Sequence, residues 1–241
     1  MQFFRVRWAL LLSVAALAVS ITECVRAQRD DQFVARTAAH VVAAAKATTP
    51  RQQVEALRAF LRSRITYDDS PQIGRPFFRA NAGEVIQRGH GWCGDGTRAF
   101  IRMASHVGIE AYRINLYGDT PHVVAAVEVE PGKRRVVDCQ QPPMVANLDL
   151  LEDVVSRKQF YYYSTLNLRR LGLPVRMVHL ESTLGALTFI TEQPHLMKAV
   201  AWALVSIGIS LMTIVLRLRL WKSLGRKVPV AGRTEPQGEP T

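Results

Sequence analysis

Cysteine is scarce in this sequence: its 241 residues include three, at positions 24, 93 and 139. They form no CxxC pair and no paired pattern, which excludes a zinc ribbon and a disulfide framework. Four of the six histidines, at positions 40, 106, 179 and 195, show no metal-ligand spacing, and the sequence has no internal repeat. We therefore predict no metal site and no cofactor, and each cysteine needs its own explanation.

Acidic residues are fewer than basic ones, 20 against 31, which gives a formal net charge of +11. Much of this excess lies in the first seven residues and beyond position 216. A nucleic-acid surface would place its basic residues on the folded domain, so we expect no nucleic acid as a partner. The length and the 48% share of hydrophobic residues fit one domain with a core plus appendages.

An uncharged apolar run covers residues 199–216. With its flanks it approaches the roughly 20 residues that cross a bilayer, so we predict a transmembrane helix at 197–221. A buried core helix is the alternative, but the run offers only Ser206, Ser210 and Thr213 for a polar stripe. The basic tail at 222–241 is predicted to be disordered and, by the positive-inside rule, cytoplasmic.

The N-terminus, residues 1–27, has a basic start followed by an apolar stretch. This pattern is typical of a signal peptide cleaved after Ala27, but residues 8–25 are also long enough for an uncleaved membrane anchor. Both alternatives export the residues beyond position 27. We expect residues 28–196 to form a domain on the periplasmic or outer side of a bacterial cytoplasmic membrane, with the lipid bilayer as a partner.

The exported segment mixes helical and strand patterns, which predicts an α+β fold. Helical spacing of apolar residues appears at 33–48, 51–66 and 97–107, with short helices beginning near Asn81 and near 148. Strand patterns cover 110–117, 122–129 and 134–139, and residues 131–133 form the turn of an antiparallel hairpin. Residues 160–192 give no clear pattern.

Cys93 lies in the glycine-rich stretch GHGWCGDGTRAF, where a turn becomes a helix. Free N–H groups and the helix dipole at such a position favour the thiolate, which is the nucleophilic form of cysteine. Gly91, Gly94 and Gly96 allow a substrate to approach the backbone, and the N–H groups there can receive an oxyanion. Trp92 would form a wall of the site.

A cysteine nucleophile also needs a base and a group that orients the base. The predicted hairpin provides both, because His122 opens one strand and Asp138 closes its partner. Counting from the turn leaves the register open by about three residues, which a bulge or a longer loop can absorb.

The motifs GWCGDGTRAF, VGIEAYR, HVVAAVEV and RVVD occur in this order within residues 51–140. In this the chain resembles the transglutaminase-like superfamily, which carries a cysteine at a helix start, then a strand histidine and a strand aspartate. The resemblance implies a papain-like core of N-terminal helices on a small antiparallel sheet, with Cys93 as nucleophile, His122 as general base and acid, and Asp138 as orienter. It departs from the family pattern at Val123, where an aromatic residue is common, and at Cys139, where proline is common.

The resemblance implies a cysteine peptidase, an amidase or a protein acyltransferase that acts on a protein or peptide, with hydrolysis slightly favoured. Gln87 lies six residues before Cys93, as a glutamine does in papain-like proteases, and is a candidate side-chain oxyanion donor beside Trp92 and Gly94. No acidic cluster indicates a calcium site.

Two alternatives to this chemistry remain open. Cys93 can be a buried structural thiol, as we expect for Cys139, which should face away from Asp138 on its strand. The same cleft can also serve a noncatalytic module that binds a cell-envelope or polysaccharide-assembly component. Redox chemistry is weaker, because Cys93 has no resolving cysteine nearby in sequence.

Overall fold

The computed structural model of the chain describes residues 2–68, 80–156, 159–165 and 191–225. These residues fall into two compact units. Residues 22–199 form the larger unit, and the two chain ends, 1–21 and 200–241, form the other. Helix α1 (Gln2–Ala44) contributes to both units.

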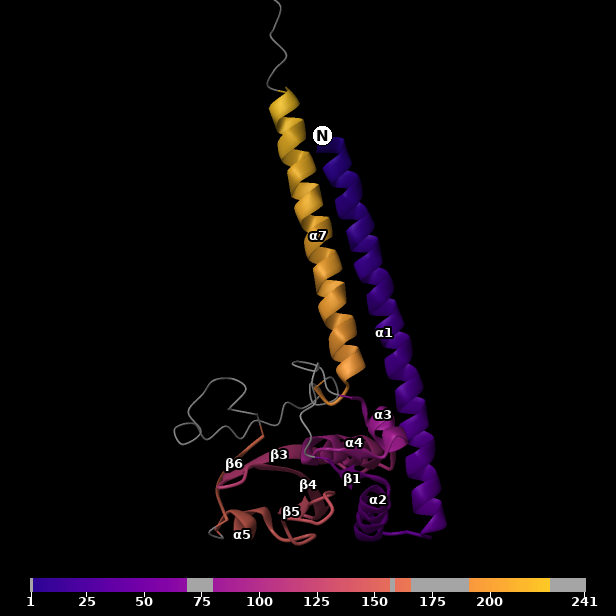
Figure 1. Ribbon diagram of the computed structural model, residues 1–241, viewed down its shortest axis with the longest axis vertical. Helices are drawn as coiled ribbons and strands as arrows, with labels where there is room; N and C mark the ends of the chain where they lie inside the picture. The colour runs from indigo at the N-terminus through magenta and orange to yellow at the C-terminus, as the bar shows by residue number, and fades with distance from the viewer. Residues whose placement is uncertain (1, 69–79, 157–158, 166–190, 226–241) are drawn as a thin grey trace, which may run out of the picture. The chain divides into compact units, whose positions relative to one another are not determined.

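The larger unit contains a four-stranded antiparallel sheet in the order β5-β4-β3-β6 (Figure 1). Its strands are β3 (Ala111–Gly118), β4 (His122–Glu130), β5 (Lys133–Val137) and β6 (Phe160–Ser164). Gly132 adopts a φ of 72° in the turn between β4 and β5, a conformation that suits glycine because it has no Cβ. This confirms the predicted hairpin.

Helices α2 (Pro50–Arg64), α3 (Ala82–Arg88) and α4 (Cys93–His106) pack with the second half of α1 around one face of the sheet. Thr49 begins α2 as an N-cap, because its hydroxyl accepts the Gln52 N–H, and Pro50 occupies the first turn, where its missing N–H costs nothing. The short strands β1 (Thr66–Tyr67) and β2 (His90–Gly91) pair in parallel beside these helices.

The alternation of strand residues divides the core between the two faces of the sheet. Ala125, Val127 and Val137 point into the larger cluster with α2 and α4. Val124 and Val136 point into a smaller cluster with β6 and with α5 (Leu151–Ser156). The hairpin is therefore buried on both faces of the sheet near its open end, at Val124, Ala125, Val136 and Val137, which anchors the residues there.

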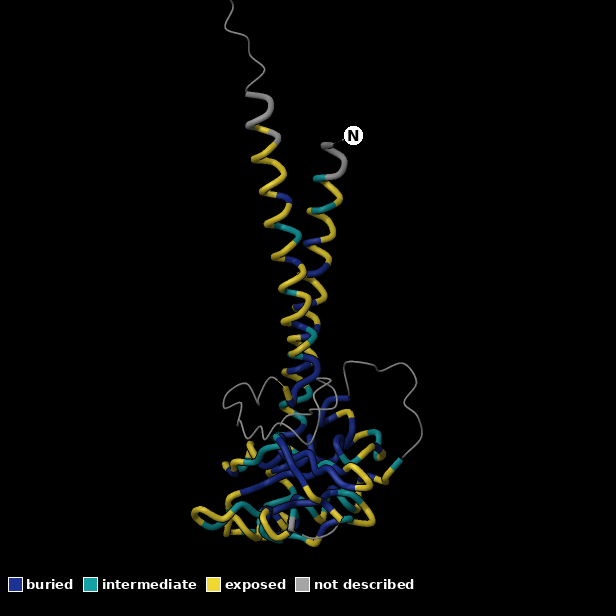
Figure 2. The backbone as a smooth tube through the Cα atoms, turned by 90° about the vertical axis from the view of Figure 1, so that its left-hand side faces the viewer, coloured by how far each residue is buried: buried dark blue, intermediate teal, exposed yellow. Residues whose placement is uncertain are grey.

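The unit formed by the chain ends consists of the first half of α1 and most of α7 (Pro194–Gly225). The Ser13 hydroxyl lies 3.0 Å from the Ser206 hydroxyl and 2.8 Å from the Ser210 hydroxyl. The stretches Val6–Ala44 and Pro194–Arg219 are long and apolar enough to cross a membrane by length and composition, a property that signal sequences share. Figure 2 shows both helices exposed over much of this unit.

Several elements differ in extent from the sequence-based expectations. The helix expected at 33–48 is the end of α1, which runs unbroken from Gln2 through the expected boundary at residue 27. Helix α4 begins four residues earlier than expected, at Cys93, and α5 is shorter than the expected helix at 148–159. Strands β1, β2 and β6 were not predicted. Most of the segment 160–192 and the tail beyond 225 lie outside the described residues.

Candidate active site

The cysteine loop begins where α3 ends. Gly89 caps α3 in the left-handed conformation, with a φ of 75°, and the chain then forms β2 beside β1. Trp92 is extended and α4 starts at the next residue, Cys93. A Cβ on Gly91 would lie 3.0 Å from the Cβ of Asp95, so a larger residue would push this loop away from the helix start. The sequence thereby places Cys93 in the first turn of a helix.

Helix α4 is held against the open end of the hairpin by Thr97, which is fully buried. Its hydroxyl lies 2.8 Å from the carbonyl oxygen of Cys93 and 3.0 Å from that of Val123. Because Val123 follows His122 on β4, the Thr97 hydroxyl connects the backbone of the cysteine to the strand that carries the histidine.

The hairpin brings His122 and Asp138 together. In the register of β4 and β5, Ala125 pairs with Val137, which places Asp138 opposite Val124 and on the same face as His122. The turn pairs Glu130 with Lys133, and a one-residue shift between Glu128 and Glu130 corrects the alternation. Without this shift Asp138 would point to the other face of the sheet.

Asp138 and His122 are almost completely buried and joined by a hydrogen bond of 2.9 Å between Nε2 of the histidine and Oδ2 of the aspartate. Three backbone N–H groups also donate to the Asp138 carboxylate, those of Gln140, Met144 and Val145. The carboxylate is therefore fixed from several directions, and its histidine bond fixes the orientation of the ring.

The pKa values of the three side chains favour the charged form of each. For Cys93, burial raises the pKa, but hydrogen bonds from His122 and from backbone N–H groups outweigh it and hold the pKa below the usual range. Burial lowers the pKa of His122, but Asp138 and Cys93 raise it to about 9. Burial raises the pKa of Asp138, and its hydrogen bonds lower it further than burial raises it. The two shifts favour a thiolate beside an imidazolium over the neutral pair.

A buried ion-pair network supports the start of α4. Arg113 on β3 forms two bonds of 2.6 Å to the Glu192 carboxylate and donates to the carbonyl oxygen of Gly94 at 3.1 Å. Arg98 lies between Glu192 and Asp95, at 3.4 and 3.2 Å. This network fixes the backbone of Gly94, the residue after Cys93, through a residue that lies only two positions before α7.

A small pocket opens beside Cys93. It is lined by residues of β1, the cysteine loop, α4 and the segment after β5, namely Ile65, Tyr67, Gly91, Trp92, Cys93, Gly96, Cys139 and Gln140. Trp92 and Tyr67 are exposed at its rim. Cys139 is buried, and burial followed by the Asp138 charge raises its pKa well above the ordinary range, so it remains a protonated core thiol, as expected.

The structure brings together Cys93, Trp92, Gly94, His122 and Asp138, whereas the Gln87 side chain lines a different pocket. That pocket lies between α1 and α3, and Gln87 is not among the residues that line the Cys93 pocket. The role of Gln87 as a side-chain oxyanion donor stays a prediction; the six-residue spacing to Cys93 spans the end of α3 and the turn at Gly89, and the Gln87 side chain lines the pocket beside α1. The backbone N–H groups at the start of α4 remain the available donors.

Sequence reasoning missed Thr97, Arg113 and Glu192. Thr97 lies four residues after Cys93, and this spacing on a helix was the only available signal. Arg113 and Glu192 are 79 residues apart, and no local pattern connects them. Among the described residues no group of three histidine, cysteine or acidic side chains could hold a metal ion.

Comparison with known proteins finds a family model that matches part of this chain. Residues 35–139 match the family model of the transglutaminase-like superfamily. Calcium-bound LapG of Legionella pneumophila aligns over 74% of this chain and 97% of its own, with 17% identity and a TM-score of 0.45. A Cytophaga hutchinsonii protein, provisionally identified as a cysteine protease, aligns over 50% of this chain with 14% identity and a TM-score of 0.41.

This chain spans 41% of the Cytophaga hutchinsonii protein. No curated protein matches the sequence. The matched range of the family model, 35–139, contains the cysteine loop, α4 and the whole β4–β5 hairpin. The similarity to the transglutaminase-like superfamily therefore covers the part of the chain that carries the candidate site, residues 35–139.

Proposed function

We propose that this protein is a membrane-anchored thiol enzyme that cleaves or transfers amide or peptide acyl groups. The observation that carries the proposal is the buried hydrogen bond of 2.9 Å between His122 and Asp138, together with Cys93 in the first turn of α4, whose pKa His122 lowers. A structural thiol needs no charged histidine beside it, and a buried histidine needs no four-fold bonded carboxylate behind it. Catalysis explains the presence of the thiol, the histidine and the carboxylate together.

In the proposed reaction the Cys93 thiolate attacks the acyl carbon and forms a tetrahedral oxyanion. Backbone N–H groups at the helix start, including that of Gly94, stabilise this charge. The imidazolium of His122 then gives its proton to the leaving amine, the carbon–nitrogen bond breaks, and a thioester to Cys93 remains. Asp138 keeps the imidazole ring in place and stabilises its positive charge.

The thioester is resolved when neutral His122 takes a proton from water or from a second amine, which attacks the acyl carbon and releases the thiolate. Water gives hydrolysis, and an amine gives acyl transfer. The half-exposed Trp92 and Tyr67 at the pocket rim suit a protein or peptide substrate, because aromatic side chains at a rim provide contact area for an extended chain. We favour hydrolysis for this domain.

The membrane part of the proposal rests on α1 and α7. We propose that residues 197–221 span the bilayer, that residues 1–27 are a second anchor or a signal peptide, and that 28–196 lie outside the cytoplasmic membrane with 222–241 inside. The apolar stretches of both helices support this, together with the basic residues after position 216. Alkaline carbonate extraction of membranes should leave the full chain in the pellet; release into the supernatant would contradict anchoring.

The thiol chemistry is tested by the pH dependence of Cys93 alkylation with iodoacetamide in the full chain, read by peptide mapping. Wild-type Cys93 should react well below the midpoint of about pH 8.5 of a free thiol. His122→Ala should abolish this early reactivity, whereas His90→Ala, which removes an exposed histidine of the same loop, should preserve it. Ordinary or absent reactivity in the folded wild type would instead favour the noncatalytic binding module.

A further inference from the structure

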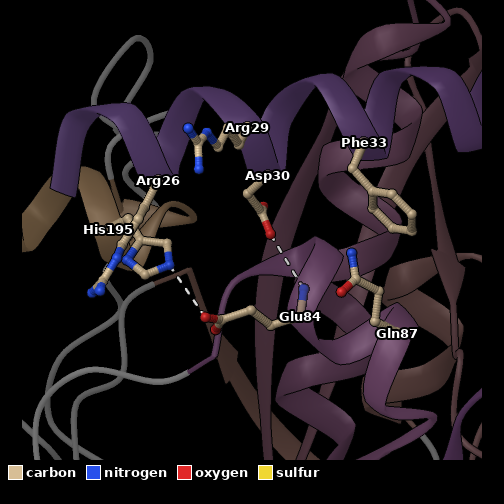
Figure 3. Close-up of a pocket in the computed structure, with 7 residues that line it drawn as sticks. All are labelled: Arg26, Arg29, Asp30, Phe33, Glu84, Gln87 and His195. Carbon is tan, nitrogen blue, oxygen red and sulfur yellow. Dashed lines mark hydrogen bonds and ion pairs between the residues drawn. The ribbon is translucent and has the colours of Figure 1, made fainter. Parts of the chain in front are cut away.

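A second pocket lies in the unit 22–199, between α1, α3 and the first residues of α7 (Figure 3). It has a volume of about 290 Å³, close to the lower end of the range for small-ligand sites. All but one of its lining side chains are polar or charged, namely Arg26, Arg29, Asp30, Glu84, Gln87 and His195, with Phe33 as the exception. The pocket is separate from the one at Cys93 and has no role in the proposed thiol chemistry.

The acidic side chains of this pocket already have partners within the protein. The Asp30 carboxylate accepts a hydrogen bond from the backbone N–H of Glu84 at 3.2 Å. Glu84 accepts one from the Asn81 N–H at 2.9 Å and lies 3.2 Å from Nε2 of His195. The other ring nitrogen of His195 contacts Glu23 at 2.5 Å. These groups hold three helices together and leave little capacity to bind a cation.

The guanidinium groups, by contrast, remain accessible. Arg26 contacts Glu23 at 2.9 Å, but its side chain is 59% exposed. Arg29 is exposed, and among the described residues it has no ion-pair partner. Figure 3 shows both arginines extending from α1 on the side of the pocket where His195 lies, with Phe33 and Gln87 opposite. The pocket therefore offers unused hydrogen-bond donors of positive charge, which suit a phosphate.

The position of the arginines in the sequence identifies the source of that phosphate. No charged residue lies between Trp8 and Thr22 of α1, and Arg26 and Arg29 come one to two turns later. His195 and Lys198 precede the charge-free run 199–216 of α7 in the same way. Where apolar stretches of this kind enter a bilayer, the residues beside them lie at the level of the lipid headgroups.

We infer that this pocket binds the phosphate of a membrane phospholipid, with Arg29 and Arg26 as the phosphate ligands. Phe33 and the Gln87 amide then line the space for the remainder of the headgroup. The inference rests on the membrane part of the proposed function with residues 1–27 retained as an anchor, because Arg26 lies in that segment, but not on the thiol chemistry. It gives the start of α7 and the second half of α1 a shared ligand at the membrane surface.

The test uses the full chain in detergent micelles and native mass spectrometry with added phosphatidylglycerol. Arg29→Gln removes the phosphate ligand that has no described ion pair, so the Glu23–His195–Glu84 contacts stay intact. It should weaken lipid retention about tenfold or more, the loss expected for a charge-assisted bond of roughly 1.5 kcal/mol. The matched control is Arg36→Gln, the same charge change two turns later on α1 and outside the pocket, which should retain lipid as the wild type does.

Equal losses in both variants would indicate a general charge effect and overturn the inference, and so would unchanged retention in Arg29→Gln. Inorganic phosphate is the second probe. If phosphate alone binds in an Arg29-dependent manner and phosphatidylglycerol does not, the ligand is a soluble phosphate and the lipid assignment is wrong. Cys93→Ala should retain lipid normally, so failure of the thiol chemistry and failure of the lipid site are read separately.

Discussion

At the scale of single residues, Asp138 is the group on which the candidate site depends most. It is fully buried and binds the ring of His122, whose raised pKa in turn holds down the pKa of Cys93. Removal of the Asp138 charge should therefore act through His122 on a sulfur atom that Asp138 does not contact.

We predict that Asp138→Asn lowers the pKa of His122 and raises that of Cys93. Without the carboxylate, burial favours the neutral imidazole, and a neutral imidazole stabilises a thiolate less than an imidazolium does. The alkylation profile of Cys93 should therefore move to higher pH, and each unit of this movement reduces the thiolate fraction at pH 7 by about tenfold.

The measurement is the iodoacetamide rate of Cys93 between pH 5 and 10, in a Cys139→Ser background that removes the other thiol of the pocket. A thermal melt of Asp138→Asn verifies that the variant is folded at the temperature of the assay. An unshifted profile in folded protein would contradict the proposed role of Asp138.

The candidate residues could be found from the sequence because each lies in a local pattern. Cys93 lies among glycines at a helix start, and His122 and Asp138 lie at the ends of strands joined by a short turn. Gln87 stays a prediction, because a spacing of six residues says nothing about direction once a helix end and a left-handed glycine intervene. Thr97 acts through the carbonyl oxygen of Val123, 26 residues away, and this contact depends on the docking of α4.

At the scale of elements, the ion pair between Arg113 and Glu192 connects strand β3, the start of α4 and the residues before α7. Both side chains are largely buried, at 16% and 5% exposure. Arg134 and Glu152 form a comparable pair between β5 and α5, but with 33% and 55% exposure. The two pairs allow the effect of burial to be tested with the same chemistry.

We predict that Arg113→Met destabilises the full chain in micelles by about 3 kcal/mol, because it leaves the Glu192 charge buried with reduced compensation. Arg134→Met should cost less than about 1 kcal/mol, the usual value of an exposed pair. Arg113→Met should also slow Cys93 alkylation, because the Gly94 carbonyl loses its donor. The free energies come from urea unfolding, and equal losses for the two variants would show that burial does not set the cost.

The elements that could be predicted from the sequence are those in which apolar residues recur at a regular spacing. Helices α2 and α4 and the β4–β5 hairpin have apolar residues at regular spacing, and all three are present. Strands β1 and β2 have two residues each and no period, and the aromatic run in β6 does not alternate in polarity. The register of the hairpin was also out of reach, because a bulge between Glu128 and Glu130 has no sequence signal here.

At the scale of the whole molecule, the two ends of the chain form one compact unit. Both apolar stretches were visible in the sequence, but their pairing was not. Each helix has apolar residues on all of its sides, so no single face indicates where the other helix packs. The contact between the two helices contains three serines, Ser13 on α1 and Ser206 and Ser210 on α7. Small polar residues let helices approach closely and form hydrogen bonds across the contact.

We predict that the double variant Ser13→Cys with Ser210→Cys forms a disulfide when membranes that contain the full chain are treated with a mild oxidant. The serine oxygens are 2.8 Å apart, which is compatible with the reach of two cysteine side chains. The control is Val14→Cys with Ser210→Cys, because Val14 is 64% exposed and adjacent in sequence. Both double variants also carry Cys24→Ser. Formation of the disulfide is measured as the loss of two hydrogens from the intact mass. Equal oxidation of the two double variants would contradict the contact between α1 and α7.

The unbroken course of α1 has a mechanical consequence. Its buried positions follow one another at intervals of three, four or seven residues along a single line from Ser13 to Ala38, including Glu23, Ala27 and Val34. An insertion of one residue in the middle of the helix would turn everything beyond it by about 100° and put the two halves of this line out of phase. Seven residues would turn it by only about 20°. An insertion in α1 that keeps this line must therefore be close to a whole number of helical turns, such as about 7, 11 or 18 residues.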